Sequence, residues 1–302
     1  MIYTVTLNPS LDYTAHAISS EYGKTNRTKN ESILPGGKGL NVSVMLKRLG
    51  VPSVALGFCA GFTGDELLRL AKSEGCDCDF IKLNSGFTRI NMKLVSGEVT
   101  EYNGSGITVT DADVAKLCKK LAGLAENDLL VLSGSVPNGA EPTVYKTLLQ
   151  SVPSGVATVL DCSGAPLKNA LCCRPFLVKP NIDELCDFFN TEIKTEAEII
   201  KYAKKLQTLG AENVLVSLGE GGAVLLTESG ECFFEKVPDG EMQNTVGAGD
   251  SMVAGFIYSL KKTGDFRKAL RFAVACGSAT AYAPWLAQKS DIEKLCKSDK
   301  IK

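Results

Sequence analysis

The chain has 302 residues, of which 44% are hydrophobic and 22% are charged, a composition typical of one large globular domain or two medium ones. Its formal net charge is -1 at pH 7, so no overall positive field indicates binding to nucleic acid or to an anionic membrane. The 11 cysteines include no C-x-x-C pair and His16 is the one histidine, which argues against a zinc site of thiols and imidazoles. We expect reduced thiols, a cytoplasmic location and no transmembrane segment.

The first third of the chain predicts both core elements and a second, more polar sheet. Residues 2–7 are typical of a buried strand. A glycine-rich turn then opens an amphipathic helix that Gly50 closes, and a further buried strand and a capped helix follow. Two segments, 11–34 and 87–103, alternate polar and apolar residues and do not fit a buried core, so we expect them to form a small separate sheet that acts as a lid.

From residue 111 onward, strands that are apolar throughout alternate with helices. We predict helices over 111–125 and 141–151, each followed by a buried strand, and then a third helix between two more strands. The uncharged stretch 272–288 is too polar to span a bilayer and predicts a buried helix that Pro284 ends. This alternation is typical of an α/β protein whose mostly parallel sheet is covered by helices on both faces.

Three glycine-rich loops raise the question of what they bind. Gly23-Lys24-Thr25 has the tail of a P-loop, but Ile18 occupies the position of its first glycine, and "GEGGAV" (219–224) lacks the last glycine of a dinucleotide fingerprint. The loop "VGAGD" opens a helix, where backbone N–H groups form an anion hole. Its acid, Asp250, fits two roles: general base for an attacking hydroxyl in phosphoryl transfer, or stabiliser of the first helical turn.

Other loops carry polar side chains that suit the binding of a sugar and of a charged group. Lys38 and Asn41 lie at the start of a second helix, Arg89 begins a lid strand, and Asp12 follows the first strand. An acid and an amide suit sugar hydroxyls, whereas two cations suit a phosphate, which carries nearly two negative charges at neutral pH. The acid and the amide also have purely structural explanations. Asp12 fits a turn, and the Asn41 side chain fits a hydrogen bond to the backbone at the start of its own helix.

Nine short motifs run through nearly the whole chain in this order: "TLNPSLD", "NRT", "PGGKGLNV", "FTGDEL", "TRIN", "LSGSVP", "KPNIDEL", "VSLGEGGA" and "NTVGAGDSMVAGF". In this combination the chain resembles the PfkB (ribokinase-like) carbohydrate kinases. The resemblance implies a single domain over 1–302, built as a three-layer α/β/α sandwich with a mostly parallel central sheet and a small β-sheet lid. The chain departs from the family pattern at Ala60, where glycine is usual, and at Cys162, where threonine is usual.

The resemblance also implies ATP-dependent phosphorylation of fructose 1-phosphate at its 6-hydroxyl, with Mg²⁺. Tagatose 6-phosphate is the alternative acceptor, and a non-catalytic protein that binds a sugar phosphate or a nucleotide is the alternative class. The expected partners are these small molecules and a second copy of the chain, joined through the lid as a homodimer. Asn181 and Glu184 would hold Mg²⁺ through waters, but N-x-x-E is also a helix-capping pattern, and both interpretations stay open.

The remaining site residues follow from the same resemblance. Asp250 becomes the base, with Gly247, Ala248 and Gly249 presenting N–H groups to the transferred phosphoryl group. The sugar phosphate is expected to contact Asp12, Arg27, Gly37, Lys38, Asn41, Arg89 and Ser135. ATP is expected to contact Lys179, Asn181, Ser217, Gly219, Gly222, Thr245, Gly247, Gly249 and Ser278.

Overall fold

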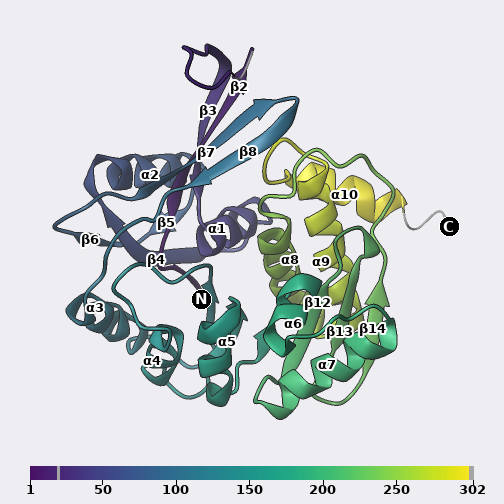
Figure 1. The fold of residues 1–302 in the computed structure, drawn as a ribbon. Coiled ribbons are helices and arrows are strands. Elements are labelled where there is room, and N and C mark those ends of the chain that lie inside the picture. Colours follow the sequence, from purple (N-terminus) through teal and green to yellow (C-terminus); the bar gives the residue numbers. More distant parts are fainter. Residues whose placement is uncertain (19–20, 299–302) are drawn as a thin grey trace.

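The computed structural model describes residues 1–18 and 21–298, which form a large and a small sheet with helices on both faces of the larger one (Figure 1). The strands of the larger sheet are β1 (Ile2–Thr6), β4 (Ser53–Ala60), β5 (Asp77–Cys78), β6 (Ile81–Leu83), β9 (Leu129–Ser133), β10 (Ala157–Asp161), β11 (Leu177–Val178), β12 (Asn213–Ser217), β13 (Ala223–Leu226) and β14 (Cys232–Glu235). They lie in the order β14-β13-β12-β11-β10-β9-β1-β4-β5, and β6 also pairs with β4. Pairing is parallel from β12 to β5 and antiparallel at β13 and β14, so the predicted mostly parallel sheet is confirmed.

Two layers of helices cover the faces of this sheet. The first layer contains α1 (Lys38–Arg48), α2 (Gly61–Ser73), α8 (Ala248–Thr263), α9 (Phe266–Ala281) and α10 (Lys289–Ser298). The second contains α3 (Asp111–Leu121), α4 (Val144–Gln150), α5 (Gly164–Ala170), α6 (Ile182–Phe189) and α7 (Glu196–Thr208), with the short 3-10 helix η1 (Leu171–Cys173). Another 3-10 helix, η2 (Gly219–Gly221), follows β12. Residues of β9 alternate between the two apolar cores: Leu129 and Val131 face the first layer, Leu130 and Leu132 the second. The three-layer α/β/α architecture is therefore confirmed. Among the described residues, no helix combines the length and the apolar character that crossing a membrane requires.

Small residues bring α8 and α9 close together. A Cβ atom on Gly255 in α8 would lie 2.6 Å from the Sγ atom of Cys276 in α9, a distance that carbon and sulfur do not tolerate. Glycine at this position therefore fixes how closely the two helices approach. Residues of both helices line one cavity of the protein.

The segment that follows α9 contacts both α1 and the start of α8. The Arg48 guanidinium of α1 donates to the carbonyl oxygens of Leu286 and Ala287 and lies 4.7 Å from the centroid of the Trp285 ring. The Leu286 side chain lies beside Gly247, where an added Cβ atom would come within 2.5 Å of its Cδ2 atom. Three stretches that are distant in sequence thus meet at one point.

The small sheet, which we call the lid sheet, projects from the body of the molecule beside α2 (Figure 1). Its strands are β2 (Ser10–Ala17), β3 (Thr28–Gly36), β7 (Arg89–Ser96) and β8 (Glu98–Asn103), in the order β3-β2-β7-β8. Both predicted lid segments contribute two strands to it.

The strand register gives the lid sheet one polar and one apolar face. Tyr13 pairs with Ile33 and Met92, and Met92 pairs with Tyr102, so these apolar side chains form a row on one face. Ile33, Met92 and Tyr102 are exposed. The alternate residues, which include Ser10, Asp12 and Asn91, form the polar face.

Candidate active site

The start of α8 lies at the carboxyl edge of the main sheet and carries Asp250. Gly247 caps the helix with a φ of +80°, a left-handed conformation that glycine adopts without strain. The first N–H groups of a helix have no partner within it and form its positive end. Asp250 is 5% exposed, and its Oδ2 accepts a hydrogen bond of 2.8 Å from Nδ2 of Asn41. Asn41 therefore orients this carboxylate through Nδ2, and its Oδ1 makes no hydrogen bond among the described residues, so the expected contact with a sugar hydroxyl stays a prediction.

A cluster of charged side chains surrounds Asp250. Asp161 ends β10 and is 1% exposed, and its Oδ1 lies 3.1 Å from Nζ of Lys38 and 3.3 Å from Nζ of Lys179. Lys38 Nζ also lies 3.8 Å from Oε1 of Glu184. One buried carboxylate oxygen thus holds two ammonium groups that come from different elements.

The cluster shifts the pKa values of its members. Burial, and next the negative charge of Asp161, raise the pKa of Asp250 from 3.8 to about 7, while Lys38, the Asn41 hydrogen bond and Lys179 act in the opposite direction. Burial would raise the pKa of Asp161, but Lys179 and Lys38 hold it below its ordinary value. Burial would lower the pKa of Lys38, but the carboxylates of Asp161 and Glu184 raise it. The cluster therefore keeps Asp161 ionised and lets Asp250 exchange its proton near neutral pH.

The polar face of the lid sheet contributes a second group of side chains. Asp12 Oδ1 accepts hydrogen bonds from Ser10 Oγ at 2.7 Å and from Asn91 Nδ2 at 3.0 Å. Arg89 Nε donates to the carbonyl oxygen of Asn8 at 3.2 Å, which fixes the guanidinium beside the end of β1. Hydrogen bonds thus hold Asp12 and Arg89, both expected at the substrate, on adjacent strands.

A cavity of about 900 Å³ adjoins the start of α8 and is lined by Ala248 and Gly249. Met252 and Val274 line it from α8 and α9, and Tyr282 lines it from the residue that ends α9. Among the residues expected to contact ATP, the cavity is lined by Asn181, Ser217, Gly219, Gly222, Thr245, Gly249 and Ser278. Lys179 belongs to the charged cluster instead, and Gly247 caps α8. Sequence reasoning missed Tyr282, because an aromatic residue at a helix end carries no specific signal.

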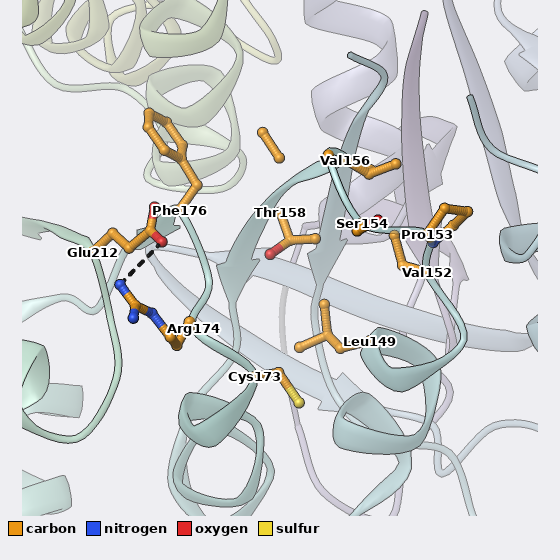
Figure 2. Close-up of a pocket in the computed structure, with 12 residues that line it drawn as sticks. Leu149, Val152, Pro153, Ser154, Val156, Thr158, Cys173, Arg174, Phe176 and Glu212 are labelled. Carbon is orange, nitrogen blue, oxygen red and sulfur yellow. Dashed lines mark ion pairs between the residues drawn. The ribbon is translucent and has the colours of Figure 1, made fainter. Parts of the chain in front are cut away.

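A second cavity, of about 390 Å³, lies at the opposite edge of the main sheet (Figure 2). Val156 and Phe176, which line it, precede β10 and β11, whereas Asp161 and Lys179 follow these strands. Figure 2 shows Arg174 reaching toward Glu212, and their closest N–O distance is 3.7 Å. This cavity is therefore separate from the charged cluster.

The other predicted substrate residues, and the departure at Ala60, differ in their surroundings. Arg27 is exposed on the connection between β2 and β3, and Ser135 is exposed after β9. Gly37 has a φ of +124° and precedes α1, where a Cβ atom would lie 2.6 Å from Cγ2 of Thr6. Ala60 has φ −153° and ψ 154°, ordinary extended angles, so alanine fits this turn without backbone strain.

Within the charged cluster, Asp161 is the residue that sequence reasoning missed. It ends the strand "ATVLD", and an acid directly after an apolar parallel strand is a usable signal, since functional groups gather at the carboxyl edge of such sheets.

Asn181 and Glu184, the residues expected to hold Mg²⁺, already contact each other. They form a capping box at the start of α6: Glu184 N–H donates to Asn181 Oδ1 at 2.7 Å, and Asn181 N–H donates to Glu184 Oε2 at 2.9 Å. The capping interpretation is therefore correct in this structure, although Oε1 of Glu184 remains directed at the cluster. In the part of the chain that the structure describes, no three acidic, cysteine or histidine side chains gather as a metal cage. Mg²⁺ usually keeps several waters and binds one or two carboxylates together with substrate phosphates, so these residues fit an ion that arrives with a nucleotide.

Phosphoryl transfer needs a base for the attacking hydroxyl and fixed positive charge around the moving group. The edge of the sheet around Asp250 offers both, next to a cavity of nucleotide size. Fold and site therefore define a small-molecule phosphotransferase. Comparison with known proteins gives the family: the model described as pfkB family carbohydrate kinase matches residues 5–285, and the chain belongs to this family.

The following relatives each cover at least 97% of the chain. A 1-phosphofructokinase of Bacillus subtilis is 41% identical over 100% of this chain and 99% of its own length. A D-tagatose-1-phosphate kinase of Bacillus licheniformis is 34% identical over 97% of both chains. Among solved structures, phosphofructokinase-2 of Escherichia coli in complex with substrates and products superposes with a TM-score of 0.91 at 30% identity and 98% coverage of both chains. The same protein has also been solved in a tetrameric inhibited form.

Proposed function

We propose that this protein transfers the γ-phosphoryl group of ATP to the 6-hydroxyl of fructose 1-phosphate, forming fructose 1,6-bisphosphate and ADP. The observation that carries the proposal is Asp250, a buried carboxylate with a pKa near neutrality at the positive start of α8. The 41% identical relative is named for this substrate. The intact acid argues against a non-catalytic binding protein.

Asp250 acts as the general base in this proposal. A base works best when its pKa lies near the working pH, because it is then largely deprotonated yet still accepts a proton readily. The Asn41 amide donates a hydrogen bond to Oδ2 of Asp250, so Oδ1 of Asp250 is the oxygen that remains for the attacking hydroxyl. The first N–H groups of α8, at Gly247, Ala248 and Gly249, stabilise the negative charge of the transferred group.

ATP occupies the 900 Å³ cavity, with its base between α9 and the segment around Gly219 and its phosphates toward the start of α8. Mg²⁺ neutralises charge on the phosphates when it is bound. Asn181 and Glu184 would hold the ion through waters. Glu184 Oε1, which the capping box does not use, is the oxygen available for this role.

The sugar phosphate lies between the lid sheet and the start of α8. Asp12 and Asn91 offer an acceptor and an amide to its hydroxyls, and Arg89 offers a planar fork of donors to its 1-phosphate. Lys38, Gly37, Arg27, Ser135 and Asn41 remain proposed contacts. Of these, Lys38 is already engaged by Asp161, and the Asn41 amide nitrogen by Asp250. Two other acceptors belong to the same reaction class. Tagatose 1-phosphate is suggested by the name of one relative, and tagatose 6-phosphate by the family resemblance of the sequence motifs.

We also propose a homodimer joined through the apolar face of the lid sheet, and a cytoplasmic location. A small sheet with one exposed apolar face is marginal alone and gains stability when a second copy covers that face. The row Tyr13, Ile33, Met92 and Tyr102 supplies that face. A cytoplasmic location supplies ATP and suits the free buried thiols of Cys59, Cys162 and Cys276.

An ADP-release assay tests the proposed reaction. The purified protein is given Mg-ATP with fructose 1-phosphate, tagatose 1-phosphate, fructose 6-phosphate, tagatose 6-phosphate or free fructose. We expect the highest kcat/KM with fructose 1-phosphate. A higher value with either tagatose phosphate would replace the proposed acceptor, and release of ADP with none of the five would overturn the proposed function.

A further inference from the structure

The parallel register of the main sheet aligns polar residues along its carboxyl edge. Thr6 pairs with Ser133, and Ser133 pairs with Asp161, so these residues of β1, β9 and β10 form one row. Lys179 extends the row, because it follows Val178, which pairs with Leu160. Since side chains alternate along a strand, this row faces the same side as Leu129 and Val131, which is the side of α1 and α8.

The two oxygens of the Asp161 carboxylate differ in their contacts. Its Oδ1 holds the Nζ atoms of both Lys38 and Lys179, at 3.1 Å and 3.3 Å. Its Oδ2 and the Oγ of Ser133 are buried and make no hydrogen bond among the described residues. A buried carboxylate with an unsatisfied oxygen is costly for folding, so a role beyond stability is needed to explain it.

The two ammonium groups are directed at the place where phosphoryl transfer is proposed. A Cβ atom on Gly249 would lie 3.1 Å from Lys179 Nζ, so this group lies against the first turn of α8. Lys38 begins α1, one turn before Asn41, which holds the base. Two like charges bound to one oxygen repel each other, and the shared carboxylate is what offsets this repulsion.

We propose that Asp161 is a positioning residue for phosphoryl transfer, which holds Lys38 and Lys179 together beside the start of α8 so that both ammonium groups face the transferred group. The inference rests on the proposed function. It assigns Asp161 no direct contact with either substrate.

The same geometry has an electrostatic consequence for the base. Groups from several elements face Asp250: Lys38 and Asn41 from α1, Asp161 from β10 and Lys179 from the residue after β11. α9, which packs along α8, contributes the buried thiol of Cys276 one to two turns farther along. Among these groups, Asp161 raises the pKa of Asp250 and the two lysines lower it. Removing the Asp161 charge should therefore lower the pKa of the base, and removing the Lys38 charge should raise it.

The experiment compares Asp161→Asn with a matched control, Asp128→Asn. Asp128 is 8% exposed, precedes β9 at the opposite edge of the sheet, and holds the N-terminal amine of Met1 at 2.6 Å. Both substitutions remove a buried carboxylate that is paired with an ammonium group. For Asp161→Asn we expect kcat to fall about 10²–10⁴-fold, the effect of two charge-assisted contacts, with a nearly unchanged KM for ATP. The control should keep its kcat within about a factor of two, as expected for a site remote from the chemistry.

The pH profile separates positioning from a general loss of structure. The acid limb of kcat/KM for Asp161→Asn should move to lower pH, while that of Asp128→Asn stays in place. Lys38→Met replaces a side chain that is 39% exposed, whereas that of Asp161 is 1% exposed, so it is expected to fold even if Asp161→Asn does not, and its acid limb should move to higher pH. Shifts in the same direction for Asp161→Asn and Lys38→Met would overturn the proposal, and so would recovery of Asp161→Asn by excess Mg²⁺, which would make Asp161 a metal ligand.

Crystal structures of Asp161→Asn and Asp128→Asn make the test independent of the sugar substrate. We expect the Nζ atoms of Lys38 and Lys179 to separate in the first variant and to stay in place in the second. If both ammonium groups keep their positions without the Asp161 carboxylate, the positioning role is wrong, whichever sugar the wild-type protein accepts. If the wild-type protein accepts none, the proposed function fails, while these two structures still decide the role of Asp161.

Discussion

Asp250→Asn should lower activity and raise stability together. The amide is nearly isosteric with the carboxylate and can still accept a hydrogen bond from Asn41 through its oxygen. It cannot take a proton from the attacking hydroxyl, so kcat should fall about 10²–10⁴-fold. Binding of ATP should persist, because the cavity walls formed by Ser217, Ser278 and Tyr282 are unchanged.

The gain in stability follows from the pKa of Asp250. Folding raises this pKa from 3.8 to about 7, so the folded protein binds the proton more tightly than the unfolded chain does. The free energy of unfolding therefore falls as pH rises from about 4 to about 7, and the loss is complete above that range. A shift of this size corresponds to on the order of 4 kcal/mol, at 1.4 kcal/mol per pKa unit. Asp250→Asn removes this penalty, so its advantage over the wild-type protein should be small at pH 4 and largest at pH 8.

Urea unfolding at pH 4.5 and pH 8 measures the difference, and the ADP-release assay measures kcat on the same preparations. The stabilisation at pH 8 should exceed that at pH 4.5 by several kcal/mol. Equal stabilisation at the two pH values would mean that Asp250 is ionised throughout, and the reasoning from burial would be wrong. A variant that keeps more than about half of the wild-type kcat would return Asp250 to a purely capping role.

Three further changes address the substrate, the α8 start and the lid sheet. Arg89→Ala should lower kcat/KM for fructose 1-phosphate about 10–10²-fold but barely change the residual rate with free fructose; equal losses for both sugars, measured by ADP release, would make Arg89 a support for the lid sheet. Gly247→Ala should lower Tm and kcat, since the residue has a φ of +80° and the new Cβ atom would meet Leu286; an unchanged melting curve would contradict this. Met92→Lys should convert the proposed dimer to a folded monomer in light scattering with unchanged circular dichroism, and a wild-type protein that is monomeric at micromolar concentration would rule the dimer out.

The sequence predicted the architecture well where elements were long and strongly patterned. Apolar strands alternating with helices identified the parallel sheet, and the two polar, alternating segments identified the lid sheet. The predicted helix over 141–151 is shorter, at Val144–Gln150, and the helix expected up to Pro284 ends at Ala281. Helix ends depend on local capping contacts, which residue patterns locate poorly.

Short elements escaped prediction for a similar reason. The seven residues of α5 and the four of β14 contain too few positions to establish a period. One expected helix after β11 is in fact two, α6 and α7, each opened by its own capping box at Asn181 and Thr195. The second capping box was visible in the sequence as "TEAE" and would have separated them.

The candidate site was predictable as a set of residues and less so as a set of contacts. Asp250, Lys38 and Asn41 were all identified, yet their partners come from elements far away in sequence. That Asn41 contacts Asp250 depends on how α1 packs against α8, and that Lys38 contacts Asp161 depends on strand order. Neither contact can be predicted from residue spacing along the chain, because both depend on how the helices pack on the sheet.

The contacts of Leu286 with Gly247, and of Arg48 with the residues around Trp285, have a consequence for how the base is held in place. Residues 285–287 join α1, which carries Asn41, to the loop that presents Asp250. A substitution in this segment that leaves the sheet intact would still loosen the contact between α1 and the start of α8. Residues that touch neither substrate would therefore control the alignment of Asp250 with the amide that orients it, so activity would be lost before the fold is.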